Sequence, residues 1–434
     1  MTMMIKCRKL LLALAAMLCL CAIAAAEEIR TATDLPSGAA DGEIWTATDL
    51  TPATADMPFA EDITQEVLIN GESTKKHLNR MRDGNYRSYW ETASYAGSRG
   101  LHITPPEGKA AGAIVIRWRS IYNVATLVQV RNEAGEWETV ARGSDDFGAA
   151  YIPLPALTQE FRVVAEADPQ TKMLISEFQV HTTGRLPKNV QVWQKATGKV
   201  DMMQIVAHPD DEILWFGGML PTYAGEQKKD VLVVCSSYRA FNRRQELLDC
   251  LWTAGVRLHP VFLDLNDMSA PTVEAVLDAW YRPHAFSSVT SLLRKHQPDV
   301  LVLQDTKGEY GHKVHQAIVY VSQKAVDYAA DATYDPDSVQ LYGTWDVPKV
   351  YIHLYKENQI KMDWNQPLSA FDGKTGHEVA AEAFLCHVSQ LKRWEYKDSE
   401  KHDNSLFGLW HTTVGPDVIG GDMFENIDKL YAEK

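Results

Sequence analysis

The sequence predicts an all-β sandwich followed by an α/β domain, in which a mostly parallel sheet is covered by helices on both faces. Two observations predict this order. Short apolar runs separated by turn residues fill residues 61–184, whereas apolar strands alternate with helical stretches over residues 200–434. The chain has 434 residues, of which 45% are hydrophobic, so it is long enough for more than one core. Residues 185–199 form the predicted linker.

The N-terminal residues have the pattern of a signal peptide. Lys6, Arg8 and Lys9 precede the apolar run 10–22, and small residues at 24–26 provide a cleavage site. We therefore expect residues 1–26 to be removed, and the protein to be secreted, periplasmic or held at the cell surface. A membrane anchor is the alternative, but the apolar run is shorter than the ~20 residues that span a bilayer. The mature chain is thus expected to have no integral membrane span.

Residues 27–60 are predicted to be a low-complexity spacer. They are rich in Thr, Ala, Asp and Pro, and the motif Thr-Ala-Thr-Asp-Leu at 31–35 returns at 46–50. Few bulky apolar side chains are available here to compensate for the entropy lost on ordering the chain. Two copies of the motif are too few for a repeat fold, so the role of the repeat stays open.

Charge and cysteine content exclude two classes of protein. The formal net charge of −14 argues against a nucleic acid partner, because binding to phosphates requires a basic surface. Of the six cysteines, only Cys235, Cys250 and Cys386 follow the predicted signal peptide. An odd number of cysteines within apolar segments indicates no disulfide framework, even in an exported protein.

The predicted sandwich resembles a known family. Its strand candidates lie at residues 113–118, 126–130, 161–164 and 173–180, with no long helical stretch between them. The order of its turn and strand motifs resembles the discoidin, or coagulation-factor C-type, galactose-binding-like family: Asp83-Gly84-Asn85, Tyr89-Trp90, Leu101-His102-Ile103, Ile114–Trp118, Trp137, Phe161-Arg162-Val163 and Ile175–Phe178. This resemblance implies a jelly roll whose loops at one end often bind carbohydrate.

Two features of this domain leave alternatives open. Trp90, Trp118 and Trp137 could form a platform for a sugar, but large aromatic side chains more often fill the core of a sandwich. Some members of the resembled family hold a structural Ca²⁺, which would lie near Asp83 in this chain. An Asp-Gly pair is more often only a turn.

The C-terminal domain is predicted to be doubly wound and Rossmann-like. Its buried strands are expected at residues 203–207, 231–235, 261–265, 300–303 and 350–354, and its helices at 243–254, 315–330 and 378–391. Strands that alternate with helices build a parallel sheet, and ligands bind at the carboxyl ends of its strands. Functional residues are therefore expected directly after these strands.

Two runs of polar residues follow predicted strands. The first is Ala207-His208-Pro209-Asp210-Asp211-Glu212, and the second is Tyr310-Gly311-His312-Lys313-Val314-His315. Burying a carboxylate without a partner costs on the order of several kcal/mol, so a positive charge is expected beside the first run. His208, Asp211 and His315 together would make a two-histidine, one-carboxylate zinc site with an open position for water.

Together the two runs resemble the PIG-L/LmbE-like deacetylases, which use zinc to remove acetyl groups from N-acetylglucosamine-type amines. The resemblance implies one zinc ion per chain, held by three ligands: His208, Asp211 and His315. It also implies that Asp210 is the general base and that His312 is the electrostatic partner of the oxyanion. Tyr310 would lie over the substrate carbonyl, with a merely packed tyrosine as the alternative.

Elementary chemistry agrees with these roles. Zinc lowers the pKa of bound water toward ~7, so that Asp210 can take its proton at neutral pH and later return it to the leaving amine. A cationic His312 and the metal would together stabilise the oxyanion. Glu212 is expected to begin a helix, where a carboxylate complements the macrodipole, or else to orient a ligand histidine.

Arg243, Asp305 and His411 are further predicted to contact substrate. Arg243 and Glu246 match an Arg-x-x-Glu pair that recurs near the sugar site of the resembled family, with an exposed ion pair as the alternative. Asp305 sits at a strand end, where it would contact a hydroxyl group or cap a turn. His411 lies in the segment 407–417, whose Gly and Pro residues indicate a loop that shapes the mouth of the pocket or wraps across the sheet.

The resulting prediction is an exported zinc-dependent deacetylase of an N-acetylated sugar or glycan, with a sandwich that holds carbohydrate. Val314 stands where many resembled proteins carry aspartate, and Lys313 replaces a usual proline, so the substrate pocket need not be that of small-thiol or glycolipid biosynthesis. One alternative is a metal-dependent hydrolase of another amide. Another is a glycan-binding surface protein with an inactive α/β domain, against which the intact runs of candidate catalytic residues argue. The sugar, its linkage and the oligomeric state stay open.

Overall fold

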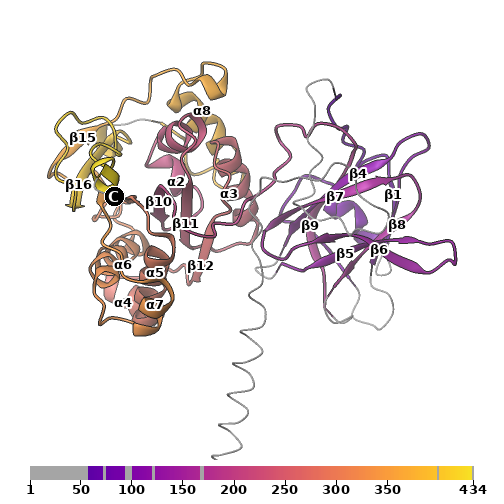
Figure 1. The fold of residues 1–434 in the computed structure, drawn as a ribbon, viewed down its shortest axis with the longest axis horizontal. Coiled ribbons are helices and arrows are strands. Elements are labelled where there is room, and N and C mark those ends of the chain that lie inside the picture. The colour runs from indigo at the N-terminus through magenta and orange to yellow at the C-terminus, as the bar shows by residue number, and fades with distance from the viewer. Residues whose placement is uncertain are drawn as a thin grey trace, which may run out of the picture. The chain divides into compact units, whose positions relative to one another are not determined.

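Antiparallel strands occupy the chain up to Thr182, and strands that alternate with helices begin at Met202 (Figure 1). The structure, a computed structural model, describes residues 57–71, 75–92, 100–119, 123–166, 171–397 and 400–432, all of which belong to the unit Ile44–Lys434. The predicted signal peptide and most of the predicted spacer lie outside the described residues. Within the described part, no helix is long and apolar enough to cross a membrane.

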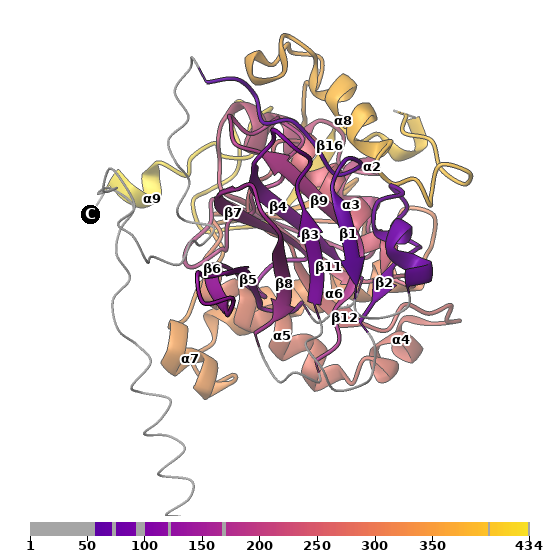
Figure 2. The same ribbon diagram turned by 90° about the vertical axis from the view of Figure 1, so that its right-hand side faces the viewer.

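Two antiparallel sheets form the N-terminal β region (Figure 2). One has the order β1-β3-β8-β5-β6: β1 (Leu68–Gly71), β3 (Gly100–Thr104), β8 (Phe161–Ala165), β5 (Thr126–Arg131) and β6 (Trp137–Gly143). The other has the order β2-β9-β4-β7: β2 (Trp90–Glu91), β9 (Leu174–Thr182), β4 (Ala111–Trp118) and β7 (Ala149–Leu157). A short helix, η1 (Lys75–Met81), follows β1. Side chains from both sheets share one apolar core, as alternating strands allow.

The three tryptophans singled out in the sequence have different surroundings. Trp90 and Trp118 are buried in the core of the β region. Trp137 is only partly buried, and the guanidinium carbons of Arg131 and Arg162 each lie 4.3 Å from its ring centroid. Trp90 and Trp118 are therefore core residues, while carbohydrate binding by the β region and its place in the discoidin family stay predictions.

Asp83 lies beside Glu177 of β9. The backbone N–H of Asn85 donates hydrogen bonds to Asp83 Oδ1 and to Glu177 Oε1, both at 2.9 Å. In the part of the chain that the structure describes, no group of three metal-ligating side chains includes this pair. A structural Ca²⁺ at Asp83 therefore stays a prediction.

Seven strands form the sheet of the α/β region, in the order β12-β11-β10-β13-β14-β16-β15. The strands from β12 to β14 are parallel, and β16 pairs antiparallel with both β14 and β15. Their bounds are β10 (Met202–Val206), β11 (Val231–Ser237), β12 (Val261–Leu265), β13 (Val300–Leu303), β14 (Lys349–His353), β15 (Gln359–Lys361) and β16 (Leu406–Thr412). The predicted mostly parallel sheet is thus present, with β12 and β13 at the predicted bounds.

Helices cover both faces of this sheet because alternate residues of its central strands face opposite sides. Val300 and Val302 contribute to one core, whereas Leu301 and Leu303 contribute to the other. The first core is covered by α2 (Asp211–Leu214), α3 (Asn242–Thr253) and α8 (Gly376–Phe384). The second is covered by α4 (Val273–Ala279), α5 (Arg282–His296) and α6 (Lys313–Ala330). Figure 1 shows these two sets of helices on opposite sides of β10 and β11.

The remaining helical elements are short. They are η2 (Pro221–Glu226), α7 (Pro336–Tyr342), η3 (Ser369–Phe371), η4 (Glu400–His402) and α9 (Lys429–Ala432). Of these, α7 packs against α5.

The helix predicted at 378–391 is too long. The structure ends α8 at Phe384 and places turns over the following residues. His387 then contacts Glu212 of α2, and Ser389 contacts Glu246 of α3. These tertiary hydrogen bonds require a departure from the helix that the local pattern does not show.

The prediction of a loop over 407–417 is wrong for residues 407–412, which lie in a strand. Leu406–Thr412 forms the strand β16, which pairs with β14 and β15. Phe407 and Leu409 alternate into the core, whereas the Gly and Pro residues that suggested a loop come mostly after the strand. This segment therefore extends the sheet.

Candidate active site

Two loops at the carboxyl ends of neighbouring parallel strands bring the predicted residues together. The loop after β10 carries His208, and the loop after β13 ends at His312, the residue before α6. Gln304 links these loops, because its Oε1 accepts the N–H of Ala207 at 2.7 Å while its Nε2 lies 3.0 Å from Nδ1 of His315. The sheet topology thus places residues that are far apart in the sequence side by side.

The three predicted metal ligands form a small triangle. Nδ1 of His208 lies 3.1 Å from Nε2 of His315 and 3.3 Å from Oδ2 of Asp211. Nε2 of His315 lies 3.4 Å from the same Asp211 oxygen. In a tetrahedral zinc site with bonds of 2.0–2.1 Å, two ligand atoms are about 3.3 Å apart. The donor atoms therefore fit a zinc ion without rearrangement.

Each of the two predicted ligand histidines also has a carboxylate at its other ring nitrogen. Glu309 Oε2 lies 2.7 Å from Nδ1 of His315, and Asp267 Oδ1 lies 3.2 Å from Nε2 of His208. Such contacts fix the tautomer and orientation of metal-ligating histidines. The turn before His315 requires Gly308, because its φ is +71° and an added Cβ would lie 2.6 Å from the carbonyl oxygen of His312.

Sequence reasoning missed Glu309 and Asp267. Glu309 directly precedes the second polar run, so its position was a usable signal. Asp267 follows β12, and only the strand order shows that the end of β12 lies near the candidate site.

The charges of the triangle favour a bound cation. Burial disfavours a charge on Asp211, but His315 and His208 hold the pKa of this carboxyl well below its ordinary value. Burial likewise disfavours a charge on His208, yet Asp211 and Asp267 raise its pKa to about 9. A metal ion at this site would take the place of the His208 proton, since metal ligands must be deprotonated.

Asp210 lies beside the triangle in a strained backbone conformation. Its φ of +116° and ψ of −29° are in the left-handed half of the map, which is costly for a residue with a Cβ. Its side chain is buried, and Oδ1 lies 3.0 Å from Nη2 of Arg243. Burial raises the pKa of Asp210 to about 7, although Arg243 opposes this shift. A carboxyl group with this pKa can accept and return a proton near neutral pH.

His312 lies on the open side of the triangle. Its ring centroid is 5.1 Å from that of His208 and 5.0 Å from that of His315, and its Nδ1 has no hydrogen-bond partner among the described residues. Burial, together with His315 and His208, lowers the pKa of His312 to about 4. This shift favours a neutral ring, which still offers one N–H donor, over the expected cationic one, and the role of His312 at the oxyanion stays a prediction.

A cavity of about 270 Å³ opens beside these residues. The residues that line it are His208, Asp210, Asp211, Leu214, Trp215, Arg239, Arg243, Asp267, Ser269, Tyr310, His312, Gln390, Arg393 and Trp394. The segment after α8 contributes Gln390, Arg393 and Trp394, none of which was singled out from the sequence, and the helix predicted at 378–391 contained only Gln390 of the three.

An aromatic wall borders the cavity. The Trp394 ring centroid lies 5.1 Å from that of Tyr310 and 5.7 Å from that of Trp215. Tyr310 is 44% exposed, so it is not a buried packing residue. Aromatic rings beside polar donors suit a ligand with both apolar and polar surfaces, as a sugar has.

Asp305 and His411 are not among the residues that line this cavity. Asp305 Oδ1 accepts the N–H of Lys307 at 3.0 Å and so caps the turn after β13. His411 is paired with Val350 near the amino end of β14, toward the sheet edge opposite the candidate site. Its Nε2 lies 2.9 Å from Oδ1 of Asp346. The structure therefore gives Asp305 a capping contact and separates His411 from the site.

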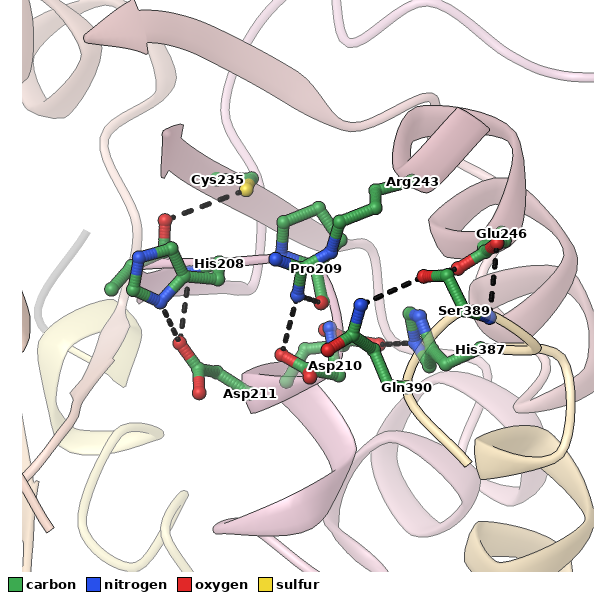
Figure 3. A network of polar contacts seen from close by, with 12 residues as sticks. His208, Pro209, Asp210, Asp211, Cys235, Arg243, Glu246, His387, Ser389 and Gln390 are labelled. Atoms are coloured by element: carbon green, nitrogen blue, oxygen red, sulfur yellow. Dashed lines mark hydrogen bonds and ion pairs between the residues drawn. The ribbon is translucent and has the colours of Figure 1, made fainter. Parts of the chain in front are cut away.

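Arg243 and Glu246 do not pair with each other. Arg243 points toward Asp210 and also donates a hydrogen bond to the carbonyl oxygen of Pro209, whereas Glu246 points toward Ser389 (Figure 3). The Ser389 hydroxyl donates to Glu246 Oε2 at 2.6 Å. Arg243 therefore orients Asp210, and Glu246 fastens the segment after α8.

Comparisons with known proteins agree with this geometry. The family described as PIG-L: GlcNAc-PI de-N-acetylase matches residues 203–326, a range that contains both polar runs. A relative in Catenulispora acidiphila, 1D-myo-inositol 2-acetamido-2-deoxy-alpha-D-glucopyranoside deacetylase 1, is 26% identical over 185 residues, which cover 35% of this chain and 54% of the relative. A relative in Saccharopolyspora erythraea, a deacetylase 2 of the same name, is 30% identical over 176 residues, which cover 34% of this chain and 63% of the relative.

The chain spans less than two thirds of the length of these two relatives. Among solved structures, N,N'-diacetylchitobiose deacetylase from Pyrococcus horikoshii is similar at 18% identity, with a TM-score of 0.34 and coverage of 44% of this chain and 70% of that chain. The match to the family falls on β10 to α6 and includes His208, Asp211 and His315. The C-terminal part of this chain therefore contains a PIG-L family domain.

Proposed function

We propose that this protein is an exported zinc-dependent deacetylase, which hydrolyses the N-acetyl amide of an N-acetylglucosamine-type sugar or glycan and releases acetate. The observation that carries the proposal is the triangle of His208, Asp211 and His315 donor atoms, with the Asp210 carboxyl beside it. The names of the two relatives describe deacetylation of acetamido sugars, which supports the same reaction for this chain.

Zinc held by these three ligands would act as a Lewis acid and would lower the pKa of a water molecule. Asp210 then takes the proton of the attacking water, since a carboxyl with a pKa of about 7 can accept and return a proton near neutral pH. The new C–O bond forms at the acetyl carbonyl carbon. When the C–N bond breaks, the same carboxyl returns its proton to the leaving amine, and acetate and the free amino sugar result.

Two residues address the carbonyl oxygen in this proposal. His312 is a neutral donor, so it stabilises the developing oxyanion through its N–H instead of through a full positive charge. The exposed Tyr310 stands beside it, with ring centroids 5.6 Å apart, and its hydroxyl is a second candidate donor. Partial burial, followed by the nearby Asp211 and Asp210 carboxylates, raises the pKa of Tyr310 above its ordinary value, so the phenol keeps its proton.

Acetate release from zinc-loaded protein tests the proposal. Chitooligosaccharides, peptidoglycan fragments and N-acetylated host-type glycans form the panel, together with N-acetylated peptides and amines. We expect acetate from at least one sugar, a loss of about 10³-fold or more in Asp210→Asn, and wild-type rates in the matched surface variant Asp327→Asn. Acetate only from peptides or amines would favour a hydrolase of another amide. A folded, zinc-loaded protein that releases no acetate from any substrate would contradict the proposal.

The β region is proposed to bind carbohydrate and so to hold the enzyme near a glycan. Support comes from the resemblance of its motifs and from the partly buried Trp137. Glycan-array binding by the full-length Asp210→Asn variant, compared with Asp210→Asn/Trp137→Ala, tests this role. Loss of binding only in the Trp137 variant would support it, and equal binding by both would remove Trp137 from the proposed surface.

A further inference from the structure

A second cluster of ionisable side chains lies directly behind Asp210. Glu212, Cys250 and His387 are all fully buried, and each offers one candidate ligand atom within 4.8 Å of the other two. His387 stands after α8, Glu212 in α2 and Cys250 in α3. None of the three lines the cavity, so the proposed reaction gives them no role.

The distances identify this cluster as a hydrogen-bonded ion pair instead of a metal site. Nε2 of His387 lies 2.6 Å from Oε1 of Glu212. Two ligands of one zinc ion would be about 3.3 Å apart, so this contact is too short for a shared metal and suits a charge-assisted hydrogen bond. Burial disfavours a charge on His387, but Glu212 raises its pKa above the ordinary value, in agreement with this short contact.

The ion pair is connected to the backbone of Asp210. The second Glu212 oxygen, Oε2, accepts the N–H of Asp210 at 2.8 Å. The backbone carbonyl of Glu212 is held as well, since it accepts Nε2 of Gln204 in β10 at 3.0 Å. Asp210 is the residue with the strained φ of +116°, and its own side chain makes no capping hydrogen bond to α2. One carboxylate oxygen of Glu212 therefore bonds His387, and the other accepts the backbone N–H of the strained residue Asp210.

We infer that His387 is a positioning residue for the general base: through Glu212 it holds the Asp210 backbone in its left-handed conformation and thereby aims the carboxyl at the metal triangle. The role of Asp210 as general base rests on the proposed function. The support of the Asp210 backbone by Glu212 and His387 rests only on the hydrogen bonds described above. The same chain segment continues to Ser389, which bonds Glu246, and to Gln390 and Trp394 in the cavity wall. The segment after α8 thus contains both His387, which bonds Glu212, and residues that line the cavity.

Kinetics of the full chain test the inference. We expect His387→Ala to lower kcat about 10- to 100-fold at nearly unchanged KM, with one zinc per chain retained. The double variant Glu212→Gln/His387→Gln replaces the ion pair by a neutral amide pair that still accepts the Asp210 N–H, and it should recover part of kcat. His296→Gln is the matched control, because His296 is a buried, hydrogen-bonded histidine of α5 that does not line the cavity.

Amide exchange provides a measurement that does not depend on activity. With nitrogen-labelled aspartate in the full chain, the Asp210 amide can be assigned by its absence in Asp210→Asn. We expect strong protection from hydrogen exchange in the wild type and in His296→Gln, and faster exchange in His387→Ala. If the wild type deacetylated no sugar, the proposed function would fail, while this comparison would still decide the positioning claim.

Two results would overturn the inference. The first is a His387→Ala protein with the kcat and the Asp210 protection of the control variant. The second is a wild type that binds two zinc ions per chain and loses one of them in His387→Ala, because the buried cluster would then be a metal site.

Discussion

At the scale of single residues, the candidate site depends on pairs in which one side chain orients another. Asp267 contacts the ring of His208, and Glu309 contacts the ring of His315. The Asp210 carboxyl contacts Arg243, and the Asp210 backbone N–H donates to Glu212. The residues to which the proposed chemistry is assigned lie in two short runs, so they could be singled out from the sequence. The orienting residues Asp267 and His387 come from other parts of the chain, where a lone Asp or His in the sequence has no distinguishing pattern.

Glu309→Gln tests this orienting role. The amide cannot carry the negative charge that faces Nδ1 of His315, so zinc affinity should fall about 10- to 100-fold. Competition with a chromophoric chelator measures the affinity, and Glu357→Gln, at an exposed glutamate, is the control. Equal affinities of the two variants would show that Glu309 does not support the metal ligand.

Glu177 gives a pH dependence to the stability of the β region. Burial, then the nearby Asp83, raises the pKa of Glu177 to about 7 in the folded state. Between its ordinary pKa and about 7, the folded state keeps a proton that the unfolded state has lost, so stability falls as pH rises through this window and then levels off. Glu177→Gln should remove this decline, because an amide does not titrate in this range. The amide oxygen can still accept the Asn85 N–H, so this hydrogen bond is kept.

Thermal unfolding of the full chain from about pH 5 to pH 8 measures this effect. Glu138→Gln, at an exposed residue of β6, is the matched control and should keep the wild-type profile. Parallel profiles for wild type and Glu177→Gln would contradict the account of Glu177.

At the scale of elements, strands and helices with a clear apolar pattern of their own were predictable. The end of α8 and the strand β16 were not. The two polar runs follow β10 and β13. Both strands are buried on both faces and therefore appear as mostly apolar runs in the sequence. The end of α8 is set by His387 and Ser389, whose partners lie in α2 and α3, and β16 is defined by its pairing with β14. Long-range contacts of this kind leave no periodic pattern to read.

The segment after α8 makes a testable contribution to substrate binding. Trp394→Ala removes one ring of the aromatic wall and should raise KM for a sugar substrate about 3- to 10-fold with little change in kcat. Trp394→Phe keeps a ring and should stay near the wild type. A change in kcat alone, at constant KM, would show that Trp394 acts on the reaction and not on binding of the sugar.

At the scale of the whole molecule, the order of the two regions and the place of the site were predictable. The β region has a core of its own, and the two faces of the second sheet form two further cores, as the change of pattern near residue 200 indicates. The site lies at the carboxyl ends of β10 and β13, where parallel sheets bind ligands. The identity of the proposed sugar substrate would depend on the shape of the cavity wall, to which distant segments contribute, and this shape has no signature in a single sequence.

Removal and return of zinc tests the central claim most directly. Acetate release from an N-acetylated sugar substrate is measured before chelation, after chelation and after one equivalent of zinc is added back to the folded protein. The account predicts that acetate release falls to background in the metal-free protein and returns with the added zinc. Undiminished acetate release from folded, metal-free protein would contradict it.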